Sequence, residues 1–445
     1  MRTQVVSLAA TLLIAPLGAR AADLVVWWDE GYYAEEGDAI AEVIAAFEHK
    51  TGKKVEFATF DQEDLPGAIE AAIESGTPPD FAFGYNLPEY VAPWAFRDRL
   101  VDLADAIGPF SNLFDPEVLN QVQLLNGASG QKALYGLPMG RSTNHLHVWK
   151  SLLERAGFTL ADIPKAWKPF WAFWCNEVQS AVRHATGRED IWGIGLPMSP
   201  TLDTVYQFLQ AVAAFDAAYV TRQGDLVIDD PQVRHGLVEA MASYTAIYRN
   251  GCAPPDAVMW DNYGNNAAFL AQRVVMVPNE TLSIPNELKD ERPDDYYENV
   301  ATIEWPLSLR GEAFPIVGAV HPAVVFKDGG NVGTAKDFVR FLVAEGWLAH
   351  YLNFSAERLL PPMPALLAQP FWLDPTDPHR MASVMQADAR PLLHHYPTAS
   401  GDWRHEQITS EYVWGKAIHR VAADGITPEQ AVDEAIARIK EILSE

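Results

Sequence analysis

Two short segments of the sequence combine aromatic rings with planar polar side chains. The first contains Trp28, Asp29 and Tyr32, and the second is the pair Tyr85 and Asn86. Flat rings stack on the C–H faces of a sugar, and carboxylate and amide groups exchange hydrogen bonds with its hydroxyls. We therefore predict that these five residues contact a small polyhydroxylated ligand. The alternative for the first segment is that Trp28 belongs to a core and the acids form a solvated turn.

Both segments follow predicted strands in an alternating strand–helix order. Apolar runs predict strands at 24–28, 55–60 and 80–84, separated by helices that end near Gly52 and Gly76. This β-α-β-α-β order is typical of an α/β fold with a mostly parallel sheet and right-handed crossovers. Because ligands bind beyond the carboxyl ends of such strands, the order places both segments at one binding edge.

The length and composition indicate a soluble protein with more than one lobe. The chain has 445 residues, which is more than a single hydrophobic core usually serves. Hydrophobic residues make up 49% and charged residues 21%, as in ordinary globular proteins. We predict two lobes.

The N-terminus carries the three parts of a signal peptide in order. Arg2 gives a positive start, residues 5–17 are largely apolar, and Ala19 and Ala21 flank Arg20 in a small-x-small pattern. We predict that residues 1–21 are removed on export; a buried N-terminal helix is the alternative. No later stretch reaches the roughly 20 apolar residues of a membrane span, and no cysteine near residue 21 could carry a lipid. The expected location is the periplasm, in free form.

The chain is strongly acidic. Its net charge of −26 would become −28 on removal of residues 1–21, which contain two arginines and no acid. Such a charge repels phosphate backbones, so we expect no nucleic-acid partner.

Two cysteines, Cys175 and Cys252, remain beyond the predicted signal. An even count in an oxidising compartment permits one disulfide, and two buried free thiols are the alternative.

No sequence motif of a common enzyme or cofactor site is present. The chain lacks H-E-x-x-H, G-x-S-x-G, P-loop and G-x-G-x-x-G patterns, so we expect no catalytic residue and no cofactor. His145 and His147 alternate on a predicted strand, as two metal ligands might, but no third ligand accompanies them. We expect exposed histidines and no metal site.

A group of tryptophans offers a possible stacking platform. Trp167, Trp171 and Trp174 recur at the spacing of one helix face, however, and this pattern predicts buried core.

The order of short motifs along nearly the whole mature chain resembles the extracellular solute-binding proteins of ABC sugar importers, of the maltose- and glycerol-phosphate-binding type. The motifs that carry the resemblance are Trp27-Trp28, Phe47–Val55, Gly76–Phe81, Tyr135–Pro138, Pro164–Trp167, Ala335–Leu342 and Leu360-Pro361. Two segments depart from the family's pattern, Val148–Lys150 and Gln272–Met276. The first departure suggests a remodelled rim of the cleft.

The resemblance implies the type II periplasmic-binding-protein fold, with two hinge-linked α/β lobes that close on a ligand. On this pattern, residues 22–140 and 318–371 form the first lobe. Residues 141–317 and 372–445 form the second.

The resemblance also adds candidate ligand contacts at the crossover, after the predicted strand 274–277 and in the return segment. These candidates are Arg141, Ser142, Asn144, Asn279, Glu280, Gly318 and His321. Arg141 could fork onto an anionic group of the ligand, and the alternative is a salt bridge within the hinge.

The function implied is that of a non-enzymatic, monomeric binding component that delivers a mono- or oligosaccharide or polyol to the permease subunits of an ABC importer. Two alternatives stay open. One is a secreted carbohydrate-active enzyme with Asp29 or Glu280 as a carboxylate. The other is a receptor for an anionic sugar derivative that uses Arg141.

Overall fold

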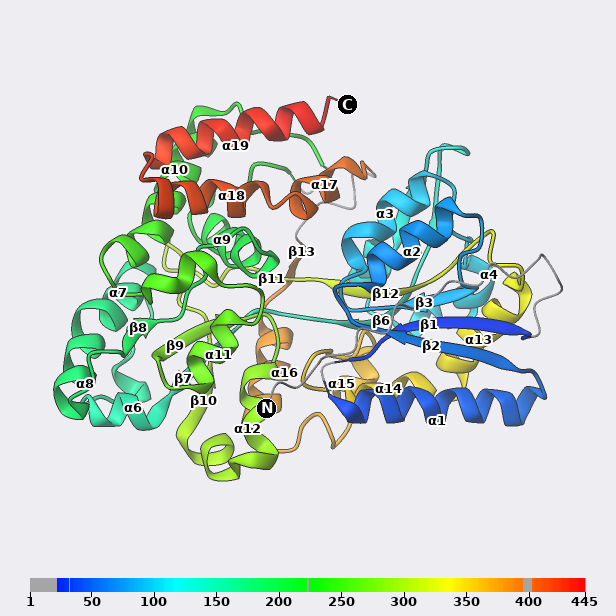
Figure 1. The fold of residues 1–445 in the computed structure, drawn as a ribbon, viewed down its shortest axis with the longest axis horizontal. Helices are drawn as coiled ribbons and strands as arrows, with labels where there is room; N and C mark the ends of the chain where they lie inside the picture. The colour runs from blue at the N-terminus through cyan, green and yellow to red at the C-terminus, as the bar shows by residue number, and fades with distance from the viewer. Residues whose placement is uncertain (1–21, 32, 222–223, 395–401, 445) are drawn as a thin grey trace, which may run out of the picture.

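Apolar strands and amphipathic helices alternate along the chain and assemble into two α/β lobes joined by extended strands (Figure 1). The computed structural model describes residues 22–31, 33–221, 224–394 and 402–444. The predicted signal peptide lies outside the described residues. In the described part, no helix is long and apolar enough to span a membrane.

The first lobe contains a five-stranded sheet in the order β2-β1-β3-β12-β6. Its elements are β1 (Leu24–Asp29), α1 (Ala34–Thr51), β2 (Val55–Phe60), α2 (Leu65–Glu74), β3 (Phe81–Phe83), α3 (Pro88–Phe96), α4 (Ala104–Ile107), η1 (Gly108–Leu113), α5 (Pro116–Gln121), β4 (Gln123–Asn126), β5 (Gln131–Leu134), β6 (Leu137–Arg141), β12 (Val320–Val325), α13 (Val332–Ala344), α14 (Trp347–Phe354) and α15 (Pro364–Leu367). The predicted β-α-β-α-β order is confirmed, and α1 ends at Gly52 with a left-handed φ of 69°.

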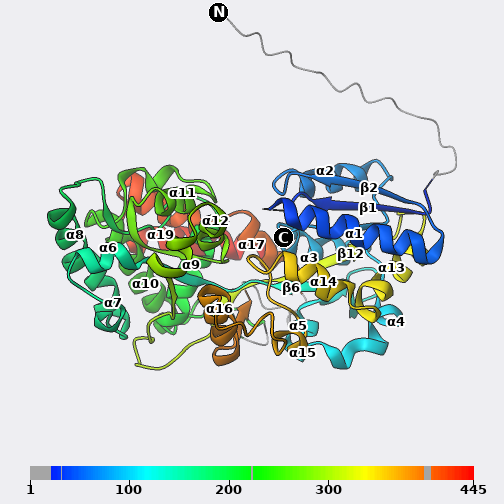
Figure 2. The same ribbon diagram turned by 90° about the horizontal axis from the view of Figure 1, so that it is seen from below.

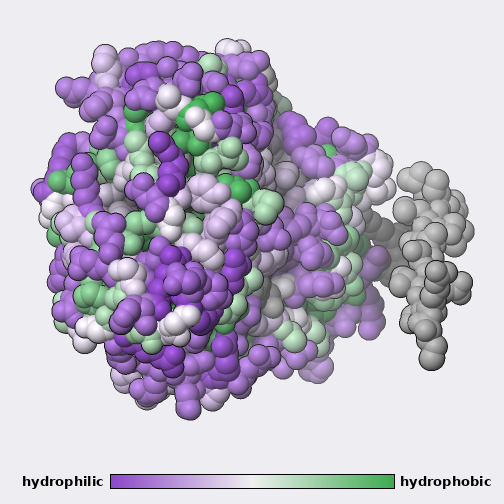
Figure 3. Space-filling model, turned by 60° about the vertical axis from the view of Figure 1, so that its left-hand side comes forward, coloured by the Kyte–Doolittle hydropathy of each residue, from purple (hydrophilic) through white to green (hydrophobic). Residues whose placement is uncertain are grey.

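The second lobe contains a four-stranded sheet in the order β10-β7-β9-β8. Its strands and helices are β7 (His145–Trp149), α6 (Lys150–Arg155), η2 (Leu160–Asp162), α7 (Trp167–Ala172), η3 (Phe173–Val178), α8 (Gln179–Thr186), β8 (Trp192–Ile194), α9 (Leu202–Ala214), α10 (Pro231–Arg249), η4 (Pro255–Met259), α11 (Gly264–Leu270), β9 (Val274–Asn279), α12 (Ser283–Glu291), η5 (Asp295–Asn299), β10 (Val300–Ile303), α17 (Arg404–Ser410), α18 (Val413–His419), η7 (Arg420–Asp424) and α19 (Pro428–Ile442). Hydrophilic residues predominate on its outer face, with hydrophobic ones scattered among them (Figure 3).

The sheets are mixed, whereas the sequence predicts mostly parallel ones. In the first sheet β12 is antiparallel to both β3 and β6, and in the second only β8 and β9 run parallel. The cause lies in the connections between the lobes. Strand β6 leads out of the first lobe and β12 leads back into it, so the two pair in opposite directions, with Val320 opposite Arg141.

Three further elements lie at the junction of the lobes: β11 (Ile316–Gly318), α16 (Pro378–Ala389) and β13 (Leu392–His394). Strands β11 and β13 pair with each other, and α16 lies between the lobes in both ribbon views (Figure 2). The lobe boundaries stay a prediction. We propose crossings near Arg141 and Gly318, and a third crossing beyond Trp372, whose ring is buried in the first lobe's core.

Cys175 and Cys252 form a disulfide in the second lobe, with Cα atoms 5.1 Å apart. This confirms the pairing that the sequence left open. The bond ties η3 to the segment that follows α10.

Candidate functional site

A pocket of about 560 Å³, including its open mouth, lies between the lobes. The first lobe contributes Gln62, Glu63, Tyr85, Asn86 and Arg358, and the second contributes Leu202, Asp203, Asn262, Tyr263, Asn266, Asn279, Glu280, Thr281 and Ser283. Apart from the two tyrosines and Leu202 the lining is polar, as hydroxyl recognition requires.

Most lining residues sit where strands end. In the first lobe, Gln62 follows β2 and Tyr85 and Asn86 follow β3, while in the second Glu280 follows β9. Because the polypeptide turns away from the sheet at these points, its side chains are free to face the space between the lobes. Of the predicted contacts, Tyr85, Asn86, Asn279 and Glu280 line the pocket.

Tyr85 is held rigidly between two other planar groups. Its ring stacks on His321 at 4.2 Å, and the guanidinium of Arg358 lies 4.5 Å from its centre. The backbone N–H of Tyr85 donates to Asp29 Oδ2 at 2.6 Å. Burial, helped by the charge of Glu280, raises the pKa of Tyr85 well above its usual value, so its hydroxyl stays neutral.

The guanidinium of Arg358 donates hydrogen bonds to three residues of the first lobe. It donates to Glu36 Oε2 at 2.9 Å, to Asp29 Oδ2 at 3.4 Å and to Gln62 Oε1 at 3.2 Å. Burial alone would lower the pKa of Arg358, but the two carboxylates raise it above its usual value. Arg358 therefore stays charged, and its guanidinium packs on one face of the Tyr85 ring.

Ser142 connects the lobes beside the pocket. Its hydroxyl donates to Glu280 Oε1 at 2.6 Å and lies 2.9 Å from His321 Nε2. The other ring nitrogen of His321 lies 3.0 Å from the carbonyl oxygen of Tyr85, so it must donate there. A hydroxyl has one hydrogen, and both imidazole nitrogens therefore donate unless Glu280 carries the proton.

Trp28 and Asp29 do not line the pocket. The side chain of Trp28 is 1% exposed in the core, where its Nε1 donates to Tyr351 at 3.3 Å, and this is the alternative the sequence left open. In the sheet β1 lies between β2 and β3, and Trp28 packs in a core cluster with residues of α1, α13 and α14. Asp29 is buried as a partner of Arg358 and Tyr85. Tyr32 lies outside the described residues.

Arg141, Asn144 and Gly318 belong to the hinge. Burial lowers the pKa of Arg141, partly offset by Asp115 and Asp388, and the side chain is absent from the pocket lining. Asn144 accepts a hydrogen bond from Gln207 at 2.9 Å. A Cβ on Gly318 would lie 2.1 Å from the Ser142 carbonyl oxygen, so the glycine permits close approach of two hinge segments, not of a ligand.

His145 and His147 are buried, which corrects the expectation that they are exposed. His145 Nε2 pairs with Ser383 at 2.7 Å, and His147 Nδ1 pairs with Thr302 at 3.0 Å. The reason is α16, which packs over this part of the second sheet and could not be placed from sequence. Among the described residues no group of three potential ligands could hold a metal ion.

The prediction for the tryptophans is confirmed for two of the three. Trp167 and Trp174 are buried, and Trp171 packs against the same core while partly exposed.

Sequence reasoning missed Asp203, in the first turn of α9. Burial raises the pKa of its carboxyl to about 7, a hydrogen bond with Asn265 opposes this shift, and the charges of Asp261 and Glu63 add to it. Within the described part of the chain, its Oδ2 is buried without a hydrogen-bond partner. The helix-capping Thr201 just before it marks the helix start, but nothing in the sequence indicates that this turn faces the other lobe.

Comparison with known proteins gives one family and many similar folds. A family model described as bacterial extracellular solute-binding protein matches residues 42–381. A search of curated proteins found no match.

Solved structures share the fold over almost the whole chain. A solute-binding protein of an ABC transporter from Thermotoga lettingae, bound to alpha-D-tagatose, is 19% identical, with a TM-score of 0.75 over 94% of this chain and 99% of that one. Maltose-bound MalE3 of T. maritima is 17% identical, with a TM-score of 0.74 over 94% and 99%. The GacH receptor of Streptomyces glaucescens is 16% identical, with a TM-score of 0.73 over 95% and 98%. These likenesses confirm the predicted two-lobed fold.

Proposed function

Because this chain belongs to the family of bacterial extracellular solute-binding proteins, we propose that it is the binding component of an ABC importer and captures a carbohydrate between its lobes. The observation that carries the proposal is the pocket itself, in which the ring of Tyr263 lies among amide, hydroxyl and carboxylate groups from both lobes. Rings and planar polar groups in this mixture suit a sugar or polyol. Two of the similar proteins bind alpha-D-tagatose and maltose.

The partners would be the membrane permease subunits of the importer, which receive the solute from a periplasmic carrier. Catalysis is not part of the proposal. Of the two carboxylates considered for a hydrolase, Glu280 lines the pocket, whereas Asp29 is buried against Arg358 outside the lining. The anionic-sugar alternative loses its main support, since Arg141 lies in the hinge and three acids line the pocket.

A thermal-shift screen of the purified mature protein against sugars and polyols tests the proposal. A ligand should raise the melting temperature in proportion to the logarithm of its concentration above the dissociation constant. Tyr263→Ala, in the pocket, should weaken binding about tenfold or more through lost stacking. Tyr297→Ala, at an exposed tyrosine of η5, is the matched control and should leave affinity unchanged. Absence of any sugar or polyol ligand, or release of a cleaved product, would overturn the proposal.

A further inference from the structure

The charged groups that line the pocket are unevenly balanced. Three are acids, Glu63, Asp203 and Glu280, and Arg358 is the one cation among the described residues of the lining. Arg358 already donates to two buried carboxylates of its own lobe, Glu36 and Asp29. It therefore supplies no spare positive charge to the pocket.

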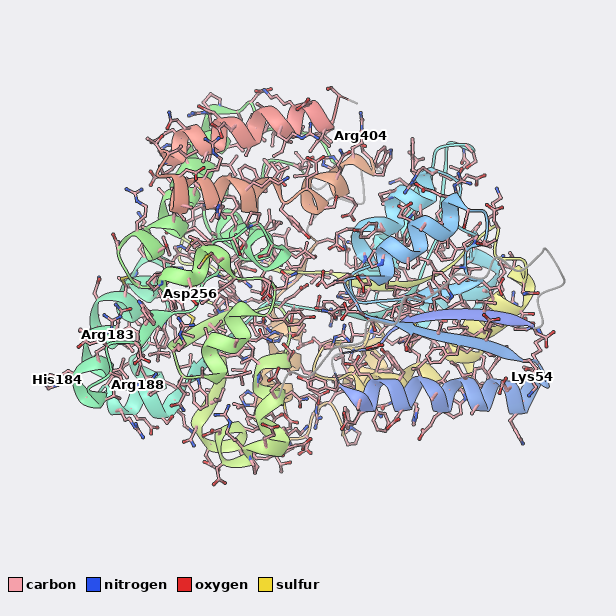
Figure 4. All side chains as sticks on the ribbon, in the orientation of Figure 1. Lys54, Arg183, His184, Arg188, Asp256 and Arg404 are labelled. Atoms are coloured by element: carbon pink, nitrogen blue, oxygen red, sulfur yellow. A yellow bond between two sulfur atoms is a disulfide. The ribbon has the colours of Figure 1, made fainter. Side chains whose placement is uncertain are left out.

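Glu280 accepts a hydrogen bond from Ser142, whose hydroxyl also contacts His321. Glu63 and Asp203 have no such arrangement, and the structure gives neither of them an ion pair in its described part. Three further basic side chains, Arg183, His184 and Arg188, lie at the outer end of the second lobe (Figure 4).

Glu63 and Asp203 belong to opposite lobes. Glu63 follows β2 in the first lobe, and Asp203 lies in the first turn of α9 in the second. Both residues line the same pocket, and the negative charge of Glu63 makes a minor contribution to the raised pKa of Asp203. Like charges that face each other across a closing cleft oppose closure, and a cation placed between them would reverse this effect.

The nature of that cation follows from the donor set. The described residues contain no group of three ligands for a metal ion. An ammonium group needs fewer carboxylates, because it offers three N–H donors to any nearby oxygens. Asp203 Oδ2, buried and without a hydrogen-bond partner in the described part, is an acceptor of the required kind.

We propose that the solute is a polyhydroxylated amine, such as an amino sugar, whose ammonium group lies between Glu63 and Asp203 while its hydroxyls contact the amide and tyrosine side chains of the pocket. This inference rests on the proposed function, and it narrows the ligand from carbohydrates in general to those with a basic nitrogen. Binding of the amine would supply the missing positive charge at the moment the lobes close.

The test uses matched probes that differ in charge: glucosamine differs by one charge from glucose and from N-acetylglucosamine, and chitobiose differs by two charges from its diacetylated form. Calorimetry on the mature protein should give about tenfold or greater preference for each amine that binds. Asp203→Asn should reduce that preference to within about threefold while leaving the neutral partners little changed. Asp190→Asn, at an exposed aspartate paired with Arg188, is the control and should keep the preference.

The outcomes separate the two proposals. Equal or tighter binding of the neutral probes by the unaltered protein overturns the amine inference and leaves carbohydrate capture standing. An equal loss of amine and neutral binding in Asp203→Asn also overturns it, since the residue would then act through shape. Failure of every polyhydroxylated probe, charged or neutral, removes the proposed function and this inference together.

Discussion

The buried carboxylate of Asp203 lowers the free energy of unfolding by an amount that depends on pH. An unfolded aspartate titrates near pH 3.9, whereas burial raises the pKa of Asp203 to about 7. Between these values the folded protein binds the extra proton, so the free energy of unfolding falls as pH rises. Asp203→Asn removes this penalty, and we expect it to stabilise the unliganded protein by on the order of 2 kcal/mol at pH 8 and hardly at all at pH 4. Thermal denaturation at both pH values measures the difference; an equal gain at both would contradict the assignment.

At the same scale, only part of the site could be predicted from sequence. Tyr85 and Asn86 could be predicted as pocket residues because they follow a recognisable strand, and the end of that strand fixes where the next side chains lie. Asp203 and Arg358 could not be predicted. Asp203 lies in the first turn of α9 and Arg358 follows α14, so the direction of each side chain depends on how those helices pack. Trp28 was predicted to contact the ligand but is buried in the core, because an aromatic residue at a strand end is compatible with both places.

Helix α16 introduces a second pH dependence. Its His379 packs with His145 and His147 of β7, and burial lowers the pKa of His145 and of His379 to about 4. Such groups contribute stability above the unfolded pKa of about 6.5, and the contribution is lost as pH falls toward 4. The melting temperature should therefore drop steeply between pH 6.5 and 4.5. His145→Gln should flatten that slope, and substitution of the exposed His235 by Gln should not; parallel slopes in all three proteins would count against the histidine cluster.

The disulfide ties η3 to the segment after α10, and its cysteines are 77 positions apart in the sequence. Closing a loop of this length restricts the unfolded chain, so replacing Cys175 and Cys252 together by Ala should cost about 4 kcal/mol. Denaturant titration of the two proteins, each with and without a thiol reductant, measures this cost. The reductant should destabilise only the unaltered protein, and an effect of similar size on the double variant would show that the bond is not its target.

The positions of helices and strands could be predicted more reliably than the direction in which neighbouring strands pair. The run 55–60 coincides with β2, and the capping box of Thr427 and Gln430 starts α19 as the sequence indicates, since both signals are local. Strand direction in the mixed sheets depends on where the chain re-enters a lobe after more than a hundred residues, and no local pattern records this.

Across the whole molecule, the two lobes touch through polar contacts outside the pocket lining. The hydroxyl of Tyr206, in α9, donates to Glu89 Oε1 of α3 at 2.8 Å, and both side chains are buried. This contact joins the second lobe to the first, so it exists only when the lobes are together. A ligand that closes the lobes has to bring these groups into contact as well, and its apparent affinity depends on the fraction of molecules that can close.

Tyr206→Phe should therefore weaken ligand binding without touching the pocket. Removing the hydroxyl leaves a buried carboxylate unpaired in the closed form, at a cost of about 1–3 kcal/mol, whereas water solvates Glu89 when the lobes part. We expect an affinity loss of about tenfold and a larger radius of gyration for the unliganded variant, measured by calorimetry and solution X-ray scattering. Tyr248→Phe is the matched control, since its hydroxyl donates to Pro255 within the second lobe at 3.0 Å. If both variants bind like the unaltered protein and scatter alike, closure does not depend on this contact, and affinity is set in the pocket alone.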